Sequence, residues 1–158
     1  MSYKMKKVPE TLNIRISVSK GNSLGKMNTK KKTWKTFCAM FDRSKVLVDT
    51  SCSFAAYSAL DTSQKGKKKM QAGNWMPALF EGGIRQGPNQ LCRTMVAFDL
   101  DYVTLEQLEN IRLGRVPISE YAWKMHTTRS HCPEIPRVRM AVPCNREMTL
   151  EEANAVTR

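Results

Sequence analysis

The sequence lacks the features that mark a membrane protein, a disulfide-stabilised secreted protein or a zinc protein. No apolar run approaches the length that crosses a bilayer, so we expect no membrane residence. The five cysteines are an odd number without C-x-x-C spacing, and no signal peptide precedes them, which predicts reduced thiols in a cytoplasmic protein. The two histidines, His126 and His131, together with Cys132 lack a fourth ligand at a recognised spacing, so zinc is not expected.

Acidic residues are also scarce. The 158 residues contain 26 Lys and Arg against 14 Asp and Glu, which gives a formal net charge of +12. A positive field of this size favours polyanions, with nucleic acid ahead of an anionic membrane surface, although excess charge also serves solubility. Charged residues make up 25% and hydrophobic residues 41%, a composition typical of a globular chain, and the length fits one domain over residues 1–158.

Residues 1–70 are predicted to form a basic amino-terminal part of this domain. Alternation from Leu12 to Val18 predicts a half-buried strand, and Thr33 can cap a helix that runs to about Arg43. A further helix is expected over 51–60. The stretches 19–32 and 62–69 are predicted to be solvated loops. Their lysine clusters are equally what a contact with nucleic-acid phosphates would contain: Lys30, Lys31, Lys32, Lys65, Lys67, Lys68 and Lys69.

Residues 71–158 carry the motifs that suggest chemistry. The segment 71–90 contains four glycines and two prolines and is too long for a plain connection, which favours a functional loop. Tryptophans are more often core residues than stacking platforms. Trp75, which lies in this polar segment, is the best candidate of the three tryptophans for stacking on a nucleic-acid base.

The segment Met95–Asp101 ends an apolar run with two aspartates. A strand is predicted over 93–100, and side chains alternate along a strand, so Asp99 and Asp101 are expected on one face, roughly 6.6 Å apart. Two neighbouring carboxylates repel each other and are costly to bury. Mg²⁺ or Mn²⁺ between them would remove that cost. The alternative is a surface turn with aspartates that cap a helix.

Capping patterns and alternation define the downstream elements. Thr104–Gln107 and Thr149–Glu152 each match a capping box. The predicted elements are a helix over 105–113, strands over 121–127 and 137–142, and a helix from 150 to the chain end. Ser130 and His131 lie between the two strands. His131 fits a structural histidine or a phosphate ligand, whereas His126, inside a strand pattern, fits a structural residue.

From Arg93 onward this order of elements and motifs resembles the archaeo-eukaryotic primase superfamily, in particular the primase-polymerase domains of phages, plasmids and integrated elements. The resemblance covers roughly 71–152 and little of the first seventy residues. D-x-D alone is a weak signal, and the ordered set is more specific. The matching residues are Phe98-Asp99-Leu100-Asp101, Thr127-Thr128-Arg129-Ser130-His131, Pro136-Arg137-Val138-Arg139 with Val142-Pro143, and Met148-Thr149-x-x-Glu152.

The resemblance implies an α+β fold with an antiparallel RRM-like sheet and helices packed on it. It implies nucleotidyl transfer from nucleoside triphosphates to make primers, with Asp99 and Asp101 as catalytic metal ligands and His131 as a triphosphate ligand. In a two-metal transfer one ion activates the attacking hydroxyl and the other neutralises the leaving pyrophosphate. Further candidates for nucleotide binding are Arg129, Ser130, Arg137 and Arg139, since arginine makes forked bonds to phosphates.

One departure from the superfamily concerns its third acidic residue, which lies on a strand downstream of the Ser-His motif. Glu134 is in a turn, and Glu147, Glu151 and Glu152 precede or open the last helix, so no third carboxylate is expected on a strand. The domain therefore looks truncated at its carboxyl end, as a fragment or a naturally short relative.

Two hypotheses stay open. The first is a primase-polymerase domain that uses divalent metal and nucleoside triphosphates. The second is a catalytically incomplete module of a mobile element that binds nucleic acid, or a nucleic-acid-binding protein, as an inhibitor or accessory factor. Because a short terminal helix buries little by itself, the second hypothesis includes a protein partner or a homodimer.

Overall fold

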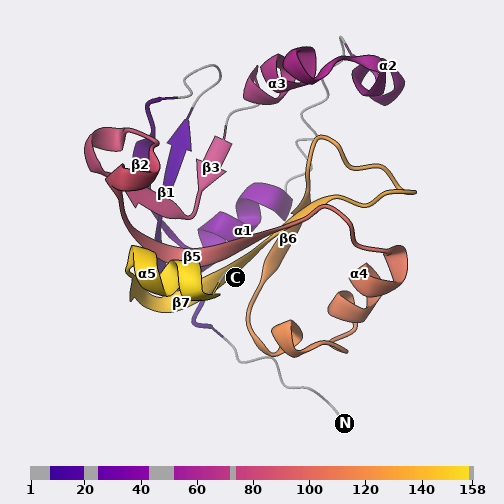
Figure 1. The fold of residues 1–158 in the computed structure, drawn as a ribbon. Coiled ribbons are helices and arrows are strands. Elements are labelled where there is room, and N and C mark those ends of the chain that lie inside the picture. The colour runs from indigo at the N-terminus through magenta and orange to yellow at the C-terminus, as the bar shows by residue number, and fades with distance from the viewer. Residues whose placement is uncertain (1–7, 20–24, 43–51, 72–73, 157–158) are drawn as a thin grey trace.

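The structure is a computed structural model that describes residues 8–19, 25–42, 52–71 and 74–156. Two antiparallel sheets and their helices form an α+β architecture (Figure 1), as the sequence predicted. The first sheet has the order β2-β1-β3, with β1 Asn13–Ser19, β2 Asn28–Thr33 and β3 Asn74–Met76. The second has the order β4-β5-β7-β6, with β4 Ala78–Phe80, β5 Gln90–Leu100, β6 Lys124–Thr127 and β7 Val138–Met148.

The helices are α1 Trp34–Asp42, α2 Phe54–Ala59, α3 Thr62–Gln71, α4 Leu105–Arg112 and α5 Leu150–Val156. The predicted capping box of α4 is present: Gln107 N donates to Thr104 Oγ1 at 3.1 Å, and Thr104 N donates to Gln107 Oε1 at 2.8 Å. In the described part of the chain, no helix combines the length and the apolar character that a membrane crossing requires.

The second sheet contains a split β-α-β unit made of β5, α4 and β6. Strands β5 and β6 each pair antiparallel with β7, which lies between them, so β5 and β6 run parallel to each other. This is the arrangement found in RRM-like sheets. Strand β4 pairs with the other side of β5. Because Val138 is opposite both Leu100 and Thr127, the ends of β5 and β6 meet the start of β7 at one edge of the sheet.

The core lies on both faces of β5. On one face, Met95 packs with buried residues of the first sheet and of α1, including Ile14, Phe37 and Trp75. On the other face, Val96 packs against Ala153 of α5. Farther along this second face, Ile111 of α4 packs with Met140 and Val142 of β7. Strand β5 is therefore sandwiched between the first sheet with α1 on one side and helices α4 and α5 on the other.

Two segments predicted as solvated loops, 19–32 and 62–69, contain regular elements instead, and residues 20–24 of the first lie outside the described residues. Residues 28–33 form β2, which pairs with β1 from Asn13–Thr33 to Val18–Asn28. This pairing satisfies the backbone of a lysine-rich segment whose side chains remain largely exposed. Residues 62–71 form α3, capped by Asp61: Gln64 N donates to Asp61 Oδ1 at 2.8 Å, and Asp61 N donates to Gln64 Oε1 at 3.2 Å. The Asp-x-x-Gln pattern is a capping signal that our sequence analysis missed.

The placement of Trp75 in a polar loop is also wrong. Trp75 lies in β3 and is only 9% exposed. Its ring packs edge-on against Phe37, with 5.1 Å between the ring centroids. A ring enclosed in this way does not offer an open face to a nucleic-acid base, so Trp75 is a core residue.

Phe37→Ala should destabilise the protein by about 3–5 kcal/mol, because Phe37 is fully buried among Trp34, Phe41 and Trp75. Met40→Ala is the matched control on the same helix, since Met40 is partly exposed, and it should cost less than about 1 kcal/mol. Urea unfolding measures both. Equal losses for the two variants would contradict this description of the core.

Candidate functional site

The candidate site lies at the sheet edge where β5 and β6 end and β7 begins. Three of its residues form a row across the sheet, since Arg139 on β7 is opposite Asp99 on β5 and His126 on β6. The row lies on the face that packs toward α1 and the first sheet. Its charged end is open to solvent, whereas His126 is half-buried.

Asp99 and Arg139 form a forked ion pair. Arg139 Nε donates to Asp99 Oδ1 at 2.6 Å, and Nη2 donates to Oδ2 at 2.9 Å. The Arg139 guanidinium also lies 5.7 Å from the centre of the Trp75 ring, a cation–π distance. Both carboxylate oxygens of Asp99, which the sequence assigned to a metal, are thus bound to Arg139.

Asp101 follows the end of β5 and lies in a bend rather than on the strand. The alternation that would place it on the same face as Asp99 therefore stops one residue before it. Across the residues that the structure describes, no three His, Cys, Asp or Glu side chains gather as a possible metal cluster. Asp99 and Asp101 therefore do not share the strand register that the sequence predicted for them.

His126 is held on three sides. Its ring stacks on Phe41, with 4.4 Å between centroids and 1° between planes. Trp75 Nε1 donates to His126 Nε2 at 3.3 Å, so Nε2 carries no proton. Nδ1 therefore carries the proton and donates to Thr127 O at 2.9 Å. Burial lowers the pKa of His126 below its ordinary value, and nearby Arg139 acts in the same direction. The neutral ring fits the structural role expected for His126.

The Ser130–His131 turn is fastened to the start of β7. Thr128 N donates to Arg137 O at 3.0 Å, and His131 N donates to Thr128 O at 3.1 Å. His131 Nδ1 accepts a hydrogen bond from Arg137 N at 3.2 Å. These bonds hold the His131 ring against the start of β7 and leave its Nε2 without a hydrogen-bond partner among the described residues.

The predicted basic residues fall into separate groups. Arg137 and Arg139 lie at the sheet edge, and Arg129 lies 5.2 Å from the ring centre of Tyr57, which links the Ser-His turn to α2. The lysine cluster 30–32 is on β2, in the other sheet, and the cluster 65–69 is on α3. The fold therefore joins the Asp, Arg and His candidates at one edge and leaves the lysines on other elements.

Glu147 corrects the expectation that no acid downstream of His131 lies on a strand. The strand β7 extends to Met148, so Glu147 is a strand residue. It does not complete the pair of aspartates, because Arg93, six residues before Asp99 on β5, is opposite Met148. Six strand residues correspond to roughly 20 Å. Glu147 thus lies at the opposite end of the strand pair.

The fold and this edge define a basic α+β domain whose conspicuous aspartate is neutralised by arginine. The chain belongs to the VapE N-terminal domain family, which matches residues 2–158. This domain is found in replication-associated proteins of phages and plasmids. The expected mobile-element context is confirmed at this level, and membership of the primase superfamily stays a prediction. Searches of curated proteins and of solved structures gave no match.

The stability of the folded protein should fall as the pH decreases, in part through His126. Because burial lowers its folded-state pKa below the ordinary value of 6.5, the unfolded chain binds more protons once the pH falls below that value. His126→Gln should shrink the loss of unfolding free energy between about pH 7.5 and about pH 5.5. Met125→Leu, a control on the same strand that alters no titratable group, should leave that loss unchanged. Urea unfolding at both pH values tests this, and an unchanged loss in His126→Gln would refute it.

Proposed function

We infer that this domain binds nucleic acid through a lysine-rich surface, as part of a mobile-element replication protein. The observation that carries the proposal is α3, which contains Lys65, Lys67, Lys68 and Lys69 and no acidic residue. Lys65 lies one turn from both Lys68 and Lys69, so like charges repel along the helix, and Gly66 weakens it further. A row of phosphates would convert this repulsion into attraction.

The lysines of β2 give weaker support. Lys30, Lys31 and Lys32 lie on an edge strand whose side chains are largely exposed. Such lysines also protect an edge strand from pairing with another chain. A helix has no unpaired edge to protect, so α3 is the more informative of the two lysine clusters.

Removing two exposed lysines of α3, as Lys67→Gln with Lys69→Gln, should weaken the binding of a fluorescein-labelled single-stranded dT oligonucleotide. Each lost phosphate contact should lower the slope of log affinity against log salt by about one, so the double variant should lose about two. Glutamine preserves helix propensity, so α3 should stay folded. Fluorescence polarisation over a salt series measures the change.

The matched control is Arg112→Gln, in the last turn of α4, with Arg115→Gln, three residues beyond that helix, which removes the same charge from exposed residues elsewhere. It should leave the salt slope nearly unchanged. Equal losses in the two double variants would show that net charge alone attracts the oligonucleotide. Absence of binding by the unaltered protein at low salt would overturn the proposal.

Metal-dependent nucleotide binding at the Asp99 edge is a second candidate function. The observation in its favour is that the strand ends gather Asp99, Arg137, Arg139 and the His131 turn at one edge. The Asp99–Arg139 pair opposes metal binding, but its side chains are 54% and 30% exposed, and exposed pairs are worth only about 0–1 kcal/mol. A divalent ion and a triphosphate can compete with such a pair. Under the alternative hypothesis, a catalytically incomplete module, the Asp99–Arg139 pair can stay intact because no metal has to bind there.

Titration calorimetry with ATP and Mg²⁺ or Mn²⁺ tests this second candidate. If it holds, Asp99→Asn with Asp101→Asn should abolish metal-dependent ATP binding and spare oligonucleotide binding. Glu106→Gln with Glu120→Gln, which alters exposed acids elsewhere, is the control. No metal-dependent heat with the unaltered protein would exclude this function and leave the nucleic-acid proposal intact.

A further inference from the structure

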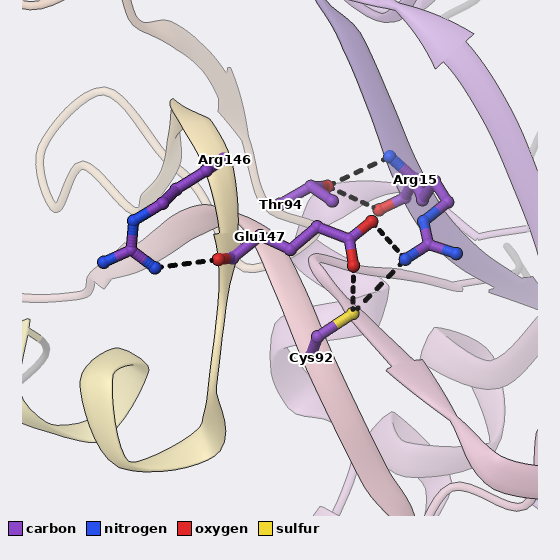
Figure 2. Close-up of polar contacts among 5 residues, drawn as sticks. All are labelled: Arg15, Cys92, Thr94, Arg146 and Glu147. Carbon is purple, nitrogen blue, oxygen red and sulfur yellow. Dashed lines mark hydrogen bonds and ion pairs between the residues drawn. The ribbon is translucent and has the colours of Figure 1, made fainter.

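A pocket of about 470 Å³ lies at the junction of the two sheets. It is at the end of the β5–β7 strand pair that is far from Asp99. It is lined by residues of four strands, among them Arg15 of β1, Lys31 of β2, Thr94 of β5, and Asn145, Arg146 and Glu147 of β7. Figure 2 shows Glu147 reaching toward Arg15, while Arg146 extends from the other side of β7. The pocket is open to solvent rather than enclosed.

Two features of the backbone build this pocket. The buried Thr94 hydroxyl accepts a hydrogen bond from Arg15 N at 3.0 Å and donates one to Arg15 O at 2.8 Å, which fastens β1 to β5. Strand β7 bulges beside it: between the pairs Met95–Pro143 and Arg93–Met148, β5 has one residue and β7 has four. A bulge re-aims the side chains that it carries. Here it brings Asn145 and Glu147 to the pocket.

The charges of the pocket are predominantly positive. Its lining includes three cationic side chains and one carboxylate, Glu147. Glu147 Oε1 is paired with Arg15, and Oε2 accepts a hydrogen bond from Cys92 Sγ at 3.4 Å. Burial raises the pKa of the Cys92 thiol, which keeps it protonated as a donor. The carboxylate is thus already engaged on both oxygens.

The three cations of the pocket differ in their partners. Arg15 Nη2 is paired with Glu147 inside the pocket and also donates to Cys92 Sγ at 3.6 Å. Arg146 is committed elsewhere, since it forms a forked pair with Glu152 at 2.6 and 2.9 Å. Lys31 is opposite Arg15 in the β1–β2 pair and forms no ion pair with another described residue. An ammonium group next to a guanidinium, with two asparagine amides nearby, is a donor set for an anion rather than for an apolar ligand.

We propose that this pocket binds a phosphate group, through Lys31 and Arg15. The phosphate can belong to a free nucleotide or to a nucleic-acid strand, and in the second case the inference rests on the proposed function. Arginine supplies a planar fork and lysine a point charge, the usual combination for phosphate oxygens. Glu147 orients Arg15 and, as the one acid of the pocket lining, weakens anion binding.

Lys31→Gln against Lys30→Gln is the decisive comparison. The two lysines are neighbours on β2 and carry the same charge, but Lys31 is opposite Arg15, whereas Lys30 is opposite the core residue Ile16. Side chains alternate along a strand, so Lys30 belongs to the other face. Lys31→Gln should weaken binding at least about tenfold, the value of a charge-assisted hydrogen bond. Lys30→Gln should change pyrophosphate binding less than about twofold and should weaken oligonucleotide binding less than Lys31→Gln does.

Two probes distinguish the sources of the phosphate. Inorganic pyrophosphate, measured by calorimetry, represents a free phosphate, and the labelled dT oligonucleotide represents a strand. If Lys31→Gln weakens pyrophosphate binding, the pocket binds free phosphates. If it weakens oligonucleotide binding by the same factor, the pocket contacts a nucleic-acid strand.

Glu147→Gln supplies a test of opposite sign. Removing the one carboxylate of the pocket lining should tighten binding of the affected probe about two- to fivefold. Glu151→Gln removes the same charge from the exposed first turn of α5, outside the pocket, and should have no such effect. Urea unfolding of each variant verifies that it is folded.

The outcomes separate this inference from the proposed function. Equal effects of Lys31→Gln and Lys30→Gln on oligonucleotide binding, without pyrophosphate binding, would overturn the pocket and leave the proposed function standing. Pyrophosphate binding that depends on Lys31, without oligonucleotide binding, would support the pocket and overturn the proposed function. Binding of neither probe by the unaltered protein would overturn both.

Discussion

The structure depends on the burial of β5 on both faces. Met95 and Val96 are neighbours in sequence, yet one packs against the first sheet and α1 and the other against α5. A strand in this position needs apolar residues on both sides, and its run of Met, Val, Ala and Phe provides them. The two layers also need a direct link, which the Thr94 hydroxyl makes by bonding both backbone groups of Arg15.

Charged residues collect at the two ends of this strand pair, where the chain leaves the core. At one end Asp99 is bound by Arg139, and at the other Glu147 is bound by Arg15. Each carboxylate thus has an arginine partner from another strand, at an exposed position where a pair is worth little stability. These pairs therefore position side chains more than they stabilise the fold. They give the domain two separate charged regions, only one of which the motifs in the sequence indicated.

The charge distribution of this domain favours attraction of polyanions. The lysines of α3, the lysines of β2 and the arginines of the sheet edge come from different elements, so the +12 net charge is spread over several surfaces. Nucleic-acid binding, nucleotide binding at the Asp99 edge and phosphate binding in the Arg15–Lys31 pocket are distinct hypotheses with distinct residues. The context of phage and plasmid replication is common to all three.

Sequence alone determined the elements whose signals are local. The capping box at Thr104 and the apolar run into Asp99 predicted α4 and β5, because caps and hydrophobic periodicity act within a few residues. Tertiary structure decided what depends on distant partners. The lysine-rich β2 is a strand because β1 pairs with it, and Trp75 is buried because α1 covers it. The register of β7 placed Arg139 opposite Asp99, and its bulge decided where Glu147 lies. No short stretch of sequence encodes either feature.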